Sequence, residues 1–573
     1  MLLKYGIYRR ETMKKLLAAL IVITMVLLSG QAYTKDVLYK ENASTILGEY
    51  EDKVILNVPI LKETDESGSI TYSKDREGNL YGPTDYAIDG NSILILNTTK
   101  NSIMVYNDGK YSQTLSLEGF EFYGTRIASA NGIHYVLGNN LTVLVLKPDS
   151  KPFIVDISKI VIDEAIFEFQ AINEYLYITD ATSTTYKLCL REENFNLENK
   201  YSGYFVDNNT IQVKTTINYS NQDQTVTNYV IDLLDLSLNK NISINFKLEN
   251  TGYAAKYLGI DPSGYYRVKI YEYLVNEDGS TQCNESIVLI DKTGTVIAQK
   301  ILETPYMSIL GQTKLVNGKI YHLNNTLEAF SINEINSFSN NIYLLEYSNT
   351  ELNNDFTNTL STNTSSISSN TNNNTLILFT LSSISRTQVI TNAVSYHSGF
   401  SWTCTSANLA TLSGWIKPGY ISGAGTYSYM PYCWGKWDTP TQFQNGLASG
   451  GRVGNIGSTY LWNTYGCDCS GFVSRCWNLD QKYYTGSLPS LCTQINYTQL
   501  QKGDILNYND TYLNDGDSSH VILFEKVDSS TGYYVCYEAT TMNSYDRVSH
   551  TSRTSTSLSS AGYVALKYNN ITG

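Results

Sequence analysis

The feature that most constrains this chain is a polar segment, residues 348–374, with the sequence SNTELNNDFTNTLSTNTSSISSNTNNN. It is almost pure Asn, Ser and Thr, so it has almost nothing to bury in a packed core. Structureless loops longer than about 12–15 residues are uncommon inside compact domains, which favours a linker over a loop within one domain. We therefore predict a linker over 347–390 that separates two folded domains, 50–346 and 391–573.

Length and composition also indicate more than one domain. The chain has 573 residues, of which 42% are hydrophobic and 17% are charged. This exceeds the roughly 100–200 residues of one compact domain. The net charge of -13 argues against a nucleic-acid partner, because phosphate backbones attract basic surfaces. The sequence has neither a P-loop motif nor HExxH, and no cofactor or metal is predicted.

The N-terminus predicts a secretory signal peptide over residues 1–32. Two lysines precede the apolar run 16–28, and residues 30–32 (GQA) offer a small-x-small cleavage site. At 1.5 Å rise per residue this run spans about 20 Å, short of the roughly 30 Å core of a bilayer. We therefore expect a secreted protein, extracellular or associated with the cell wall, with no stable membrane span after cleavage.

The first region, 50–346, contains many short runs of β-branched and aromatic residues bounded by Gly, Asn or Asp, such as 92–97 and 133–137. Such runs are typical of strands. They form about six weak repeats, spaced about 40–50 residues apart, which suggests propeller blades. Residues 82–90 (GPTDYAIDG) resemble a blade of the NHL-type propellers. We predict an all-β, six-bladed β-propeller, with stacked β-sandwich domains as the alternative.

The motifs of this first region are explained by the residues that strands and turns require. His134 and His322 lie in apolar strand patterns, where a hydrogen-bonded core histidine is a simpler interpretation than a ligand. Turn geometry alone explains the Asp, Asn and Gly residues between strands. We expect this region to bind a ligand that the sequence does not identify, and its deletion should spare catalysis elsewhere in the chain.

The second region carries residues suited to thiol chemistry. Residues 466–479 (GCDCSGFVSRCWNL) contain apolar positions at helical spacing, which places Cys469 in the first turn of a buried helix. The N-terminal end of a helix favours a thiolate nucleophile, and a histidine must accept the proton. His397 and His550 have polar, Ser/Thr-rich neighbours and are expected to face solvent. His520, at the start of an apolar strand, is therefore the candidate base.

The sequence around His520 predicts a β-hairpin. His520 opens the run HVILFEKVD, a turn follows at 528–532, and YYVCYEAT returns. If the turn centres on residue 530, strand pairing places His520, Glu538 and Thr540 on one face of the sheet. Glu538 would then orient the imidazole of a Cys–His–Glu triad, with Thr540 as its rival.

These motifs together resemble the NlpC family of secreted cell-wall cysteine peptidases. The resemblance rests on DCSGFV at 468–473, LQKGDIL at 500–506 and the strand that begins at His520, and it covers about 395–573. It implies a papain-like α+β domain in which Cys469 and His520 are catalytic, with a variable third position. It also implies bacterial peptidoglycan peptides as substrate, cleaved commonly at the D-γ-glutamyl to diamino-acid bond.

The same resemblance implies substrate-binding residues. Residues 430–435 (MPYCWG) are similar to the family's Pro-Tyr-x-Trp-Gly-Gly element, with Lys436 in place of the second Gly. In the family, the tyrosine of this element and both neighbours of the nucleophile contact the substrate. Tyr432, Asp468 and Ser470 are therefore the predicted substrate-binding residues.

Two alternative functions stay open at this point. An amidase or acyltransferase would use the same Cys–His machinery, because water and another amine attack the same thioester. In the other alternative the protein is a non-catalytic binding protein that acts through its propeller.

The cysteine count predicts disulfides in the second region. Seven of the nine cysteines lie in the last third of the chain. An odd count in an oxidising compartment leaves one thiol unpaired, which we expect to be Cys469, while the other six form disulfides in one of 15 possible schemes.

Overall fold

The computed structural model describes most of the chain from residue 52 onward. The described residues are 52–60, 68–74, 80–120, 122–191, 194–222, 224–275, 281–303, 311–326, 328–336, 338, 383–509 and 519–573. The predicted signal peptide, 1–32, and most of the predicted linker, 347–390, lie outside these ranges.

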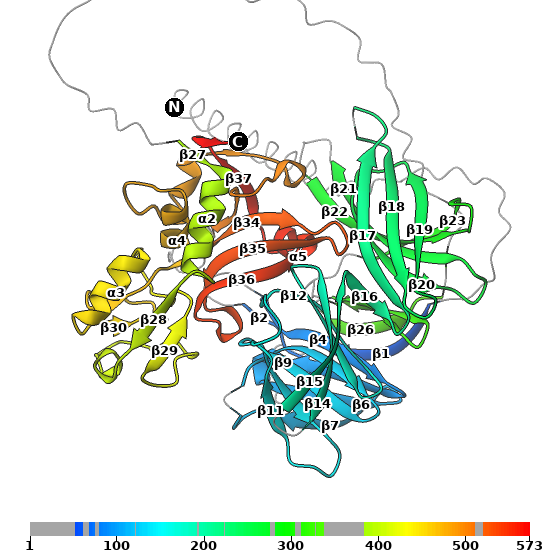
Figure 1. The fold of residues 1–573 in the computed structure, drawn as a ribbon, viewed down its shortest axis with the longest axis horizontal. Coiled ribbons are helices and arrows are strands. Elements are labelled where there is room, and N and C mark those ends of the chain that lie inside the picture. Colours follow the sequence, from blue (N-terminus) through cyan, green and yellow to red (C-terminus); the bar gives the residue numbers. More distant parts are fainter. Residues whose placement is uncertain are drawn as a thin grey trace, which may run out of the picture. The chain divides into compact units, whose positions relative to one another are not determined.

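Within the described residues, six four-stranded antiparallel sheets follow one another along the first region (Figure 1). The strands of the first three sheets are β4 (Pro83–Asp89), β5 (Ser92–Asn97), β6 (Ser102–Asn107), β7 (Lys110–Ser116), β8 (Gly124–Ala130), β9 (Ile133–Gly138), β10 (Thr142–Leu146), β11 (Phe153–Asp156), β12 (Ile166–Ile172), β13 (Tyr175–Asp180), β14 (Thr184–Arg191) and β15 (Asn194–Ser202). The strands of the next two sheets are β16 (Tyr204–Asp207), β17 (Thr210–Tyr219), β18 (Thr227–Asp235), β19 (Lys240–Leu248), β20 (Gly252–Ile260), β21 (Tyr266–Val275), β22 (Thr281–Ile290) and β23 (Val296–Ile301). The sixth sheet contains β24 (Thr313–Val316), β25 (Lys319–Asn325), β26 (Ala329–Glu334) and β1 (Lys53–Pro59), and a separate ribbon pairs β2 (Ser73–Lys74) with β3 (Leu80–Tyr81).

These sheets are the blades of a β-propeller. The first strands of five successive sheets, β8, β12, β16, β20 and β24, line one common cavity, whereas a sandwich would bury two sheets against each other. Strand β1 pairs with β26, so the N-terminal end of the region completes the last blade. The predicted propeller is therefore confirmed over the alternative of stacked sandwiches.

Short sequence signals set the hairpins within the blades. Asp108-Gly109, Asn131-Gly132 and Asn317-Gly318 each connect two paired strands and all six residues have positive φ. Two-residue hairpin turns of this kind require positive φ at both positions, which Gly, Asn and Asp adopt most readily. Local sequence therefore determines where these strands end.

The second region is an α+β unit built on one six-stranded antiparallel sheet in the order β32-β37-β33-β34-β35-β36. Its strands are β32 (Cys492–Gln494), β33 (Ile505–Asn509), β34 (Ser519–Val527), β35 (Tyr533–Thr540), β36 (Arg547–Thr554) and β37 (Val564–Tyr568). The helices are α2 (Arg386–Tyr396), α3 (Pro440–Ala448), α4 (Cys469–Cys476) and α5 (Ser555–Ser560). Short two-stranded pairs join β27 (Ile384–Ser385) with β38 (Ile571–Thr572), β28 (Ser401–Cys404) with β29 (Gly425–Ser428), and β30 (Arg452–Val453) with β31 (Thr464–Tyr465).

Helix α2 begins inside the range 347–390 that composition assigned to the linker. Ser385 caps it, because the Ser385 hydroxyl accepts a hydrogen bond from Gln388 N at 3.1 Å. An N-cap serine fixes a helix start even where the preceding chain is polar. None of the helices in the described ranges is long and apolar enough to cross a membrane.

Both faces of the six-stranded sheet are covered. One face, which we call the α4 face, carries Val521, Leu523 and Tyr537, and these pack in one core with the side chains of α4 and α2. The other, which we call the α5 face, carries Ile522 and Cys536 among others, which pack with Leu558 of α5. Successive residues of a strand alternate between these faces.

The propeller and the α+β unit share hydrophobic cores. Tyr273 of β21 packs into the core on the α5 face, where its hydroxyl lies 2.6 Å from that of Tyr534. Tyr533 and Val535 of β35 pack with Phe167 of the propeller. Because these cores contain residues from both regions, deletion of the propeller would expose apolar surface of β35. The expectation that such a deletion spares catalysis in the second region stays a prediction, and these shared cores count against it.

Candidate functional site

Cys469 is the first residue of helix α4, as the sequence predicts. Asp468 is the N-cap, and its Oδ1 accepts a hydrogen bond from Gly471 N at 2.7 Å. Cys469 itself is 7% exposed and belongs to the core on the α4 face. The N-terminal end of a helix stabilises negative charge, so this position suits a thiolate.

The two neighbours of Cys469 hold the start of the helix. Asp468 Oδ2 accepts a hydrogen bond from Gly435 N at 2.9 Å and also pairs with the Lys482 ammonium group. Ser470 Oγ donates to Asp468 Oδ1 at 3.2 Å. The predicted substrate-binding groups Asp468 and Ser470 thus take part in helix capping and in the attachment of α4 to the turn at Gly435. Their contact with a substrate stays a prediction.

Tyr432, the third predicted substrate-binding residue, lies beside the segment that leads into α4. It is 2% exposed and forms a parallel bridge with Cys467, and its backbone N donates to Asp546 O at 2.8 Å. Lys436, which replaces a glycine of the family element, is buried and donates to Tyr460 Oη at 3.1 Å. The lysine therefore anchors the loop that carries Tyr460.

Gly471 is required by the close approach of the neighbouring chain. A Cβ atom at this position would lie 2.3 Å from the carbonyl oxygen of Lys436. Any larger side chain would push α4 away from the segment that contains Lys436. The DCSG sequence is therefore explained in part by packing, independently of catalysis.

The predicted contact between His520 and Glu538 is present. Strands β34 and β35 pair Leu523 with Tyr537, and this register places positions 520 and 540 opposite each other, as a turn centred on residue 530 requires. His520 Nε2 and Glu538 Oε2 lie 2.8 Å apart, and both side chains are fully buried. A bulge at Glu525, between Phe524 and Lys526, was not predicted and does not disturb this pairing.

The Glu538 carboxylate accepts hydrogen bonds from other residues besides His520. Arg553 donates to its carboxylate from Nη2 at 2.6 Å and from Nε at 3.1 Å, and the Thr551 hydroxyl donates as well. Burial alone would raise the pKa of Glu538, but the charge of Arg553 and the hydrogen bond to His520 hold the pKa far below its usual value. Glu538 is therefore a carboxylate at neutral pH and can stabilise a protonated imidazole.

His520 and Cys469 lie on opposite faces of the sheet. His520 pairs across the ladder with Tyr508, which belongs to the core on the α5 face, whereas Cys469 belongs to the core on the α4 face. Cross-strand partners share a face, so the imidazole points away from α4. The structure therefore joins His520 to Glu538, and the contact of this pair with the Cys469 thiol stays a prediction.

The burial of neighbouring residues is the physical reason for this placement. Val521 and Leu523 pack against α4, and because side chains alternate along a strand, their neighbour His520 must face the other way. Thr551 and Arg553 then secure Glu538 on the same α5 face.

The expected disulfides are absent. All nine cysteines lie within the described ranges and all carry free thiols. Cys476 and Cys536 lie in cores on opposite faces of the sheet, which keeps them apart. The Cys433 thiol donates to Thr464 Oγ1 at 3.3 Å, and burial raises its pKa to about 12. Buried, protonated thiols of this kind pack as small apolar groups.

A buried ionic cluster, which the sequence did not predict, joins the propeller to the α+β unit. Its members, the interface cluster, are Asp163, Glu164, His397, Glu525, Arg547 and His550. Glu164 lies 2.9 Å from His397 Nε2 and accepts from Arg547 Nη2 at 2.8 Å. The two oxygens of Asp163 lie 3.1 and 3.0 Å from His550 Nδ1.

These contacts correct the expectation that His397 and His550 face solvent. The two histidines are 6% and 5% exposed, because the acidic pair Asp163-Glu164 covers them. Burial opposes charge on His550, but its hydrogen bonds to Asp163 and Glu525 raise its pKa to about 9. One signal was available in the sequence: an acidic pair interrupts the apolar run IVIDEAIF and therefore needs buried partners.

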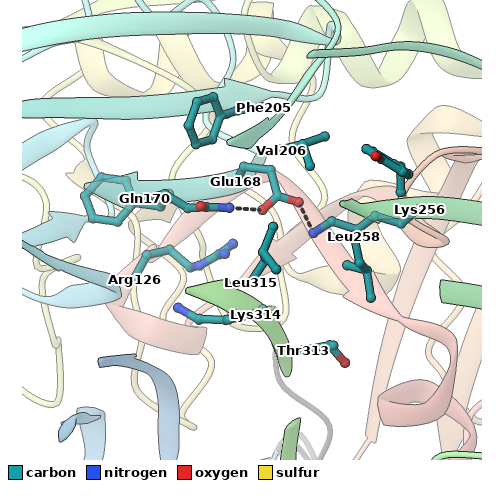
Figure 2. Close-up of a pocket in the computed structure, with 13 residues that line it drawn as sticks. Arg126, Glu168, Gln170, Phe205, Val206, Lys256, Leu258, Thr313, Lys314 and Leu315 are labelled. Carbon is teal, nitrogen blue, oxygen red and sulfur yellow. Dashed lines mark hydrogen bonds and ion pairs between the residues drawn. The ribbon is translucent and has the colours of Figure 1, made fainter. Parts of the chain in front are cut away.

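The propeller contains a small cavity (Figure 2). Its charged lining residues are Arg126, Glu168, Lys256 and Lys314. Lys256 Nζ lies 2.5 Å from Glu168, while Arg126 and Lys314 share one carboxylate, that of Asp85, at 3.1 and 2.7 Å. Sequence reasoning missed these residues because they lie on different blades.

The two histidines of the propeller behave as predicted. His322 is buried and its Nδ1 lies 2.9 Å from Thr313 Oγ1, while His134 Nδ1 lies 2.9 Å from Ser129 Oγ. Burial lowers the pKa of His322 to about 3, so it is neutral. In the part of the chain that the structure describes, no group of three His, Cys, Asp or Glu residues is placed to hold a metal ion.

Comparison with known proteins adds little to this description. No family model and no curated protein matches the chain. Among solved structures, BamB from Moraxella catarrhalis is similar at 9% identity, with a TM-score of 0.25, over 50% of this chain and 98% of that chain. The WD40 β-propeller domain of Doa1 is similar at 12% identity, with a TM-score of 0.26, over 49% of this chain and 96% of that chain. At such TM-scores these matches carry no argument.

Proposed function

We propose that this chain is a secreted, non-catalytic binding protein whose ligand site lies in the propeller. The observation that supports the proposal is the placement of Cys469 and His520 on opposite faces of one sheet. A nucleophilic thiol of this kind needs a histidine beside it that accepts its proton. The α+β unit then serves as a support that shares cores with the propeller.

The second candidate is a cysteine peptidase that cleaves peptidoglycan stems, with an amidase or acyltransferase as its chemical variants. Two observations favour it: Cys469 lies at the capped start of α4, and His520 already pairs with a carboxylate. To complete a triad, however, His520 would have to turn to the α4 face. That turn would remove it from Glu538, which Arg553 holds on the α5 face.

Digestion of purified peptidoglycan by the full-length protein separates the two candidates. We expect no release of peptides by mass spectrometry, with identical results for wild type, Cys469→Ala and the matched control Cys476→Ala. Peptide release that is abolished in Cys469→Ala and retained in Cys476→Ala would refute the binding proposal and establish the peptidase.

A second measurement reports on the thiol without a substrate. Alkylation of Cys469 by iodoacetamide, followed by peptide mapping, gives its rate as a function of pH. A histidine that activates the thiol makes the alkylation rate depend on the imidazole. We expect equal rates for wild type and His520→Ala at every pH, and a slower reaction in His520→Ala would favour the peptidase.

A further inference from the structure

The segment between helices α2 and α4, residues 397–467, carries more basic than acidic side chains. It contains three Lys/Arg residues, Lys417, Lys436 and Arg452, and a single Asp/Glu residue, Asp438. The whole chain has the opposite balance, with 41 Lys and Arg against 54 Asp and Glu. A local excess of positive charge on an otherwise acidic protein attracts anions to that part of the surface.

Neutral oxygens, and not carboxylates, hold these three cations. Lys417 Nζ donates to the carbonyl of Pro418 at 3.2 Å, and Arg452 Nη1 donates to that of Gly450 at 2.7 Å. Within the described ranges, neither these two side chains nor Lys436 forms an ion pair with an acidic side chain. The positive charge of the segment is therefore not neutralised by direct ion pairs.

Lys436 is the cation for which this matters most, because it is only 8% exposed. Its Nζ donates to Tyr460 Oη and to the backbone O of Trp462, both at 3.1 Å. The nearest acid along the chain, Asp438, accepts a hydrogen bond from Gly466 N at 2.9 Å instead. An ammonium group has three donors, and an anion that reached the third would reduce the cost of burying this charge.

The loop 454–463, which joins β30 to β31, presents exposed aromatic rings beside Lys436. Trp462 is 77% exposed, more than any other large hydrophobic side chain in the described part of the chain, and Tyr460 is 58% exposed. Ile416, at 53% exposed, lies along the same loop, because its backbone N donates to Asn455 Oδ1 at 3.1 Å. Exposed apolar groups that gather among polar ones mark interaction sites.

Short contacts fix this loop in place. Asn455 Nδ2 donates to Thr459 O at 2.9 Å, which closes the first half of the loop. Tyr460 packs directly on Gly435, where an added Cβ atom would lie 2.7 Å from the ring. Lys436 then holds the second half from below. A surface that is ordered before it binds loses less conformational entropy on binding.

The combination of exposed rings and an unpaired cation limits the kind of ligand. A sugar ring has faces of C–H groups that pack on an aromatic ring, and a sugar acid adds one carboxylate for the ammonium group. Single-stranded nucleic acids also combine stacking with negative charge, but the net charge of -13 on this chain disfavours a polyphosphate. The observations therefore favour a carboxylated sugar polymer.

We propose that this surface binds an acidic polysaccharide. We call the surface the aromatic platform, and its members are Ile416, Lys436, Tyr460 and Trp462. Sugar rings lie on Tyr460 and Trp462, and a sugar carboxylate accepts a hydrogen bond from Lys436. The platform belongs to the α+β unit, so this inference goes beyond the proposed function and requires neither a propeller ligand nor the Cys469 thiol.

Isothermal titration of the full-length protein with tetragalacturonate and with its methyl ester tests the charge requirement. The two probes share the same sugar rings and linkages, and the ester lacks the charge. We expect the ester to bind about tenfold more weakly or worse, because hydrogen bonds to charged groups are stronger than neutral ones. Equal binding of the two probes, or no binding of tetragalacturonate, would overturn the proposal.

Trp462→Ala tests the stacking surface. The ring is exposed, so its removal should leave the fold intact and weaken binding of both probes by about tenfold or more. The matched control is Leu238→Ala, which truncates a side chain of similar exposure, 69%, in the propeller. Binding that is unchanged in Trp462→Ala would refute the platform.

Lys436→Gln tests the ammonium group, since glutamine keeps N–H donors for the loop but carries no charge. We expect this variant to bind the acid and the ester equally, whereas Trp462→Ala should still prefer the acid. Loss of the loop's anchor alone would weaken both probes and leave that preference in place, which would refute the role of Lys436. Lys502→Met removes the same charge from an exposed lysine and should behave as wild type.

An oligothymidylate of eight nucleotides tests the other class of stacking anion. We expect it to bind more weakly than tetragalacturonate. Tighter binding of the oligothymidylate that is lost in Trp462→Ala would overturn the polysaccharide and identify a surface for single-stranded nucleic acid.

Discussion

Replacement of Glu538 tests the buried network on the α5 face most directly. The carboxylate is fully buried and accepts hydrogen bonds from His520, Thr551 and two nitrogens of Arg553. Glu538→Ala leaves the Arg553 guanidinium, which is only 13% exposed, without its counter-charge. Removal of one partner from a buried ion pair costs about 3–5 kcal/mol. This is a large part of the total stability of about 5–15 kcal/mol that folded domains possess.

A double-mutant cycle measures the coupling free energy between Glu538 and Arg553 separately from the other effects of truncating each side chain. We would measure urea unfolding of full-length wild type, Glu538→Leu, Arg553→Met and the double variant. Apolar residues that replace both partners of a buried pair are often neutral or stabilising. The double variant should therefore be more stable than the sum of the single losses predicts, by about 0.5–3 kcal/mol. Glu118→Ala, at an exposed position, is the matched control and should stay within about 0.5 kcal/mol of wild type.

A small loss of unfolding free energy that is additive with that of Arg553→Met would contradict a buried ion pair at Glu538. If Glu538→Ala cost less than about 1 kcal/mol and the cycle showed no coupling, the carboxylate would have to be accessible to water, as exposed ion pairs are. The sheet would then lack the register that places Glu538 beside His520.

Two further predictions concern pH and the thiols. Because the pKa of His550 is raised to about 9, its stabilising effect is present below its ordinary value of 6.5 and is lost as pH rises through 9. The free energy of unfolding should therefore fall between pH 7 and pH 10 in urea titrations, and a slope that persists in His550→Phe would show that another group is responsible. Because all nine cysteines carry free thiols, alkylation of the denatured, unreduced protein should add nine labels by intact mass, and seven or fewer would demonstrate a disulfide.

Local signals in the sequence determined much of the architecture. The Asp-Gly and Asn-Gly turns fix the ends of hairpins because those residues adopt positive φ. Asp468 caps the helix at Cys469, and Gly532 and its neighbours set the turn that pairs His520 with Glu538. Each of these features depends on contacts between residues close in sequence, so a single sequence is sufficient to predict them.

Only the tertiary structure decided which face of the sheet each candidate residue occupies. The run HVILF is apolar at every position after His520, because α4 covers one face of β34 and residues of α5 and the propeller cover the other. A strand buried on both faces has no polar alternation, so its sequence cannot indicate which side chains point toward the helix. The interface cluster and the cavity lining are decided in the same way, since their charges come from separate blades and strands that only the folded chain brings together.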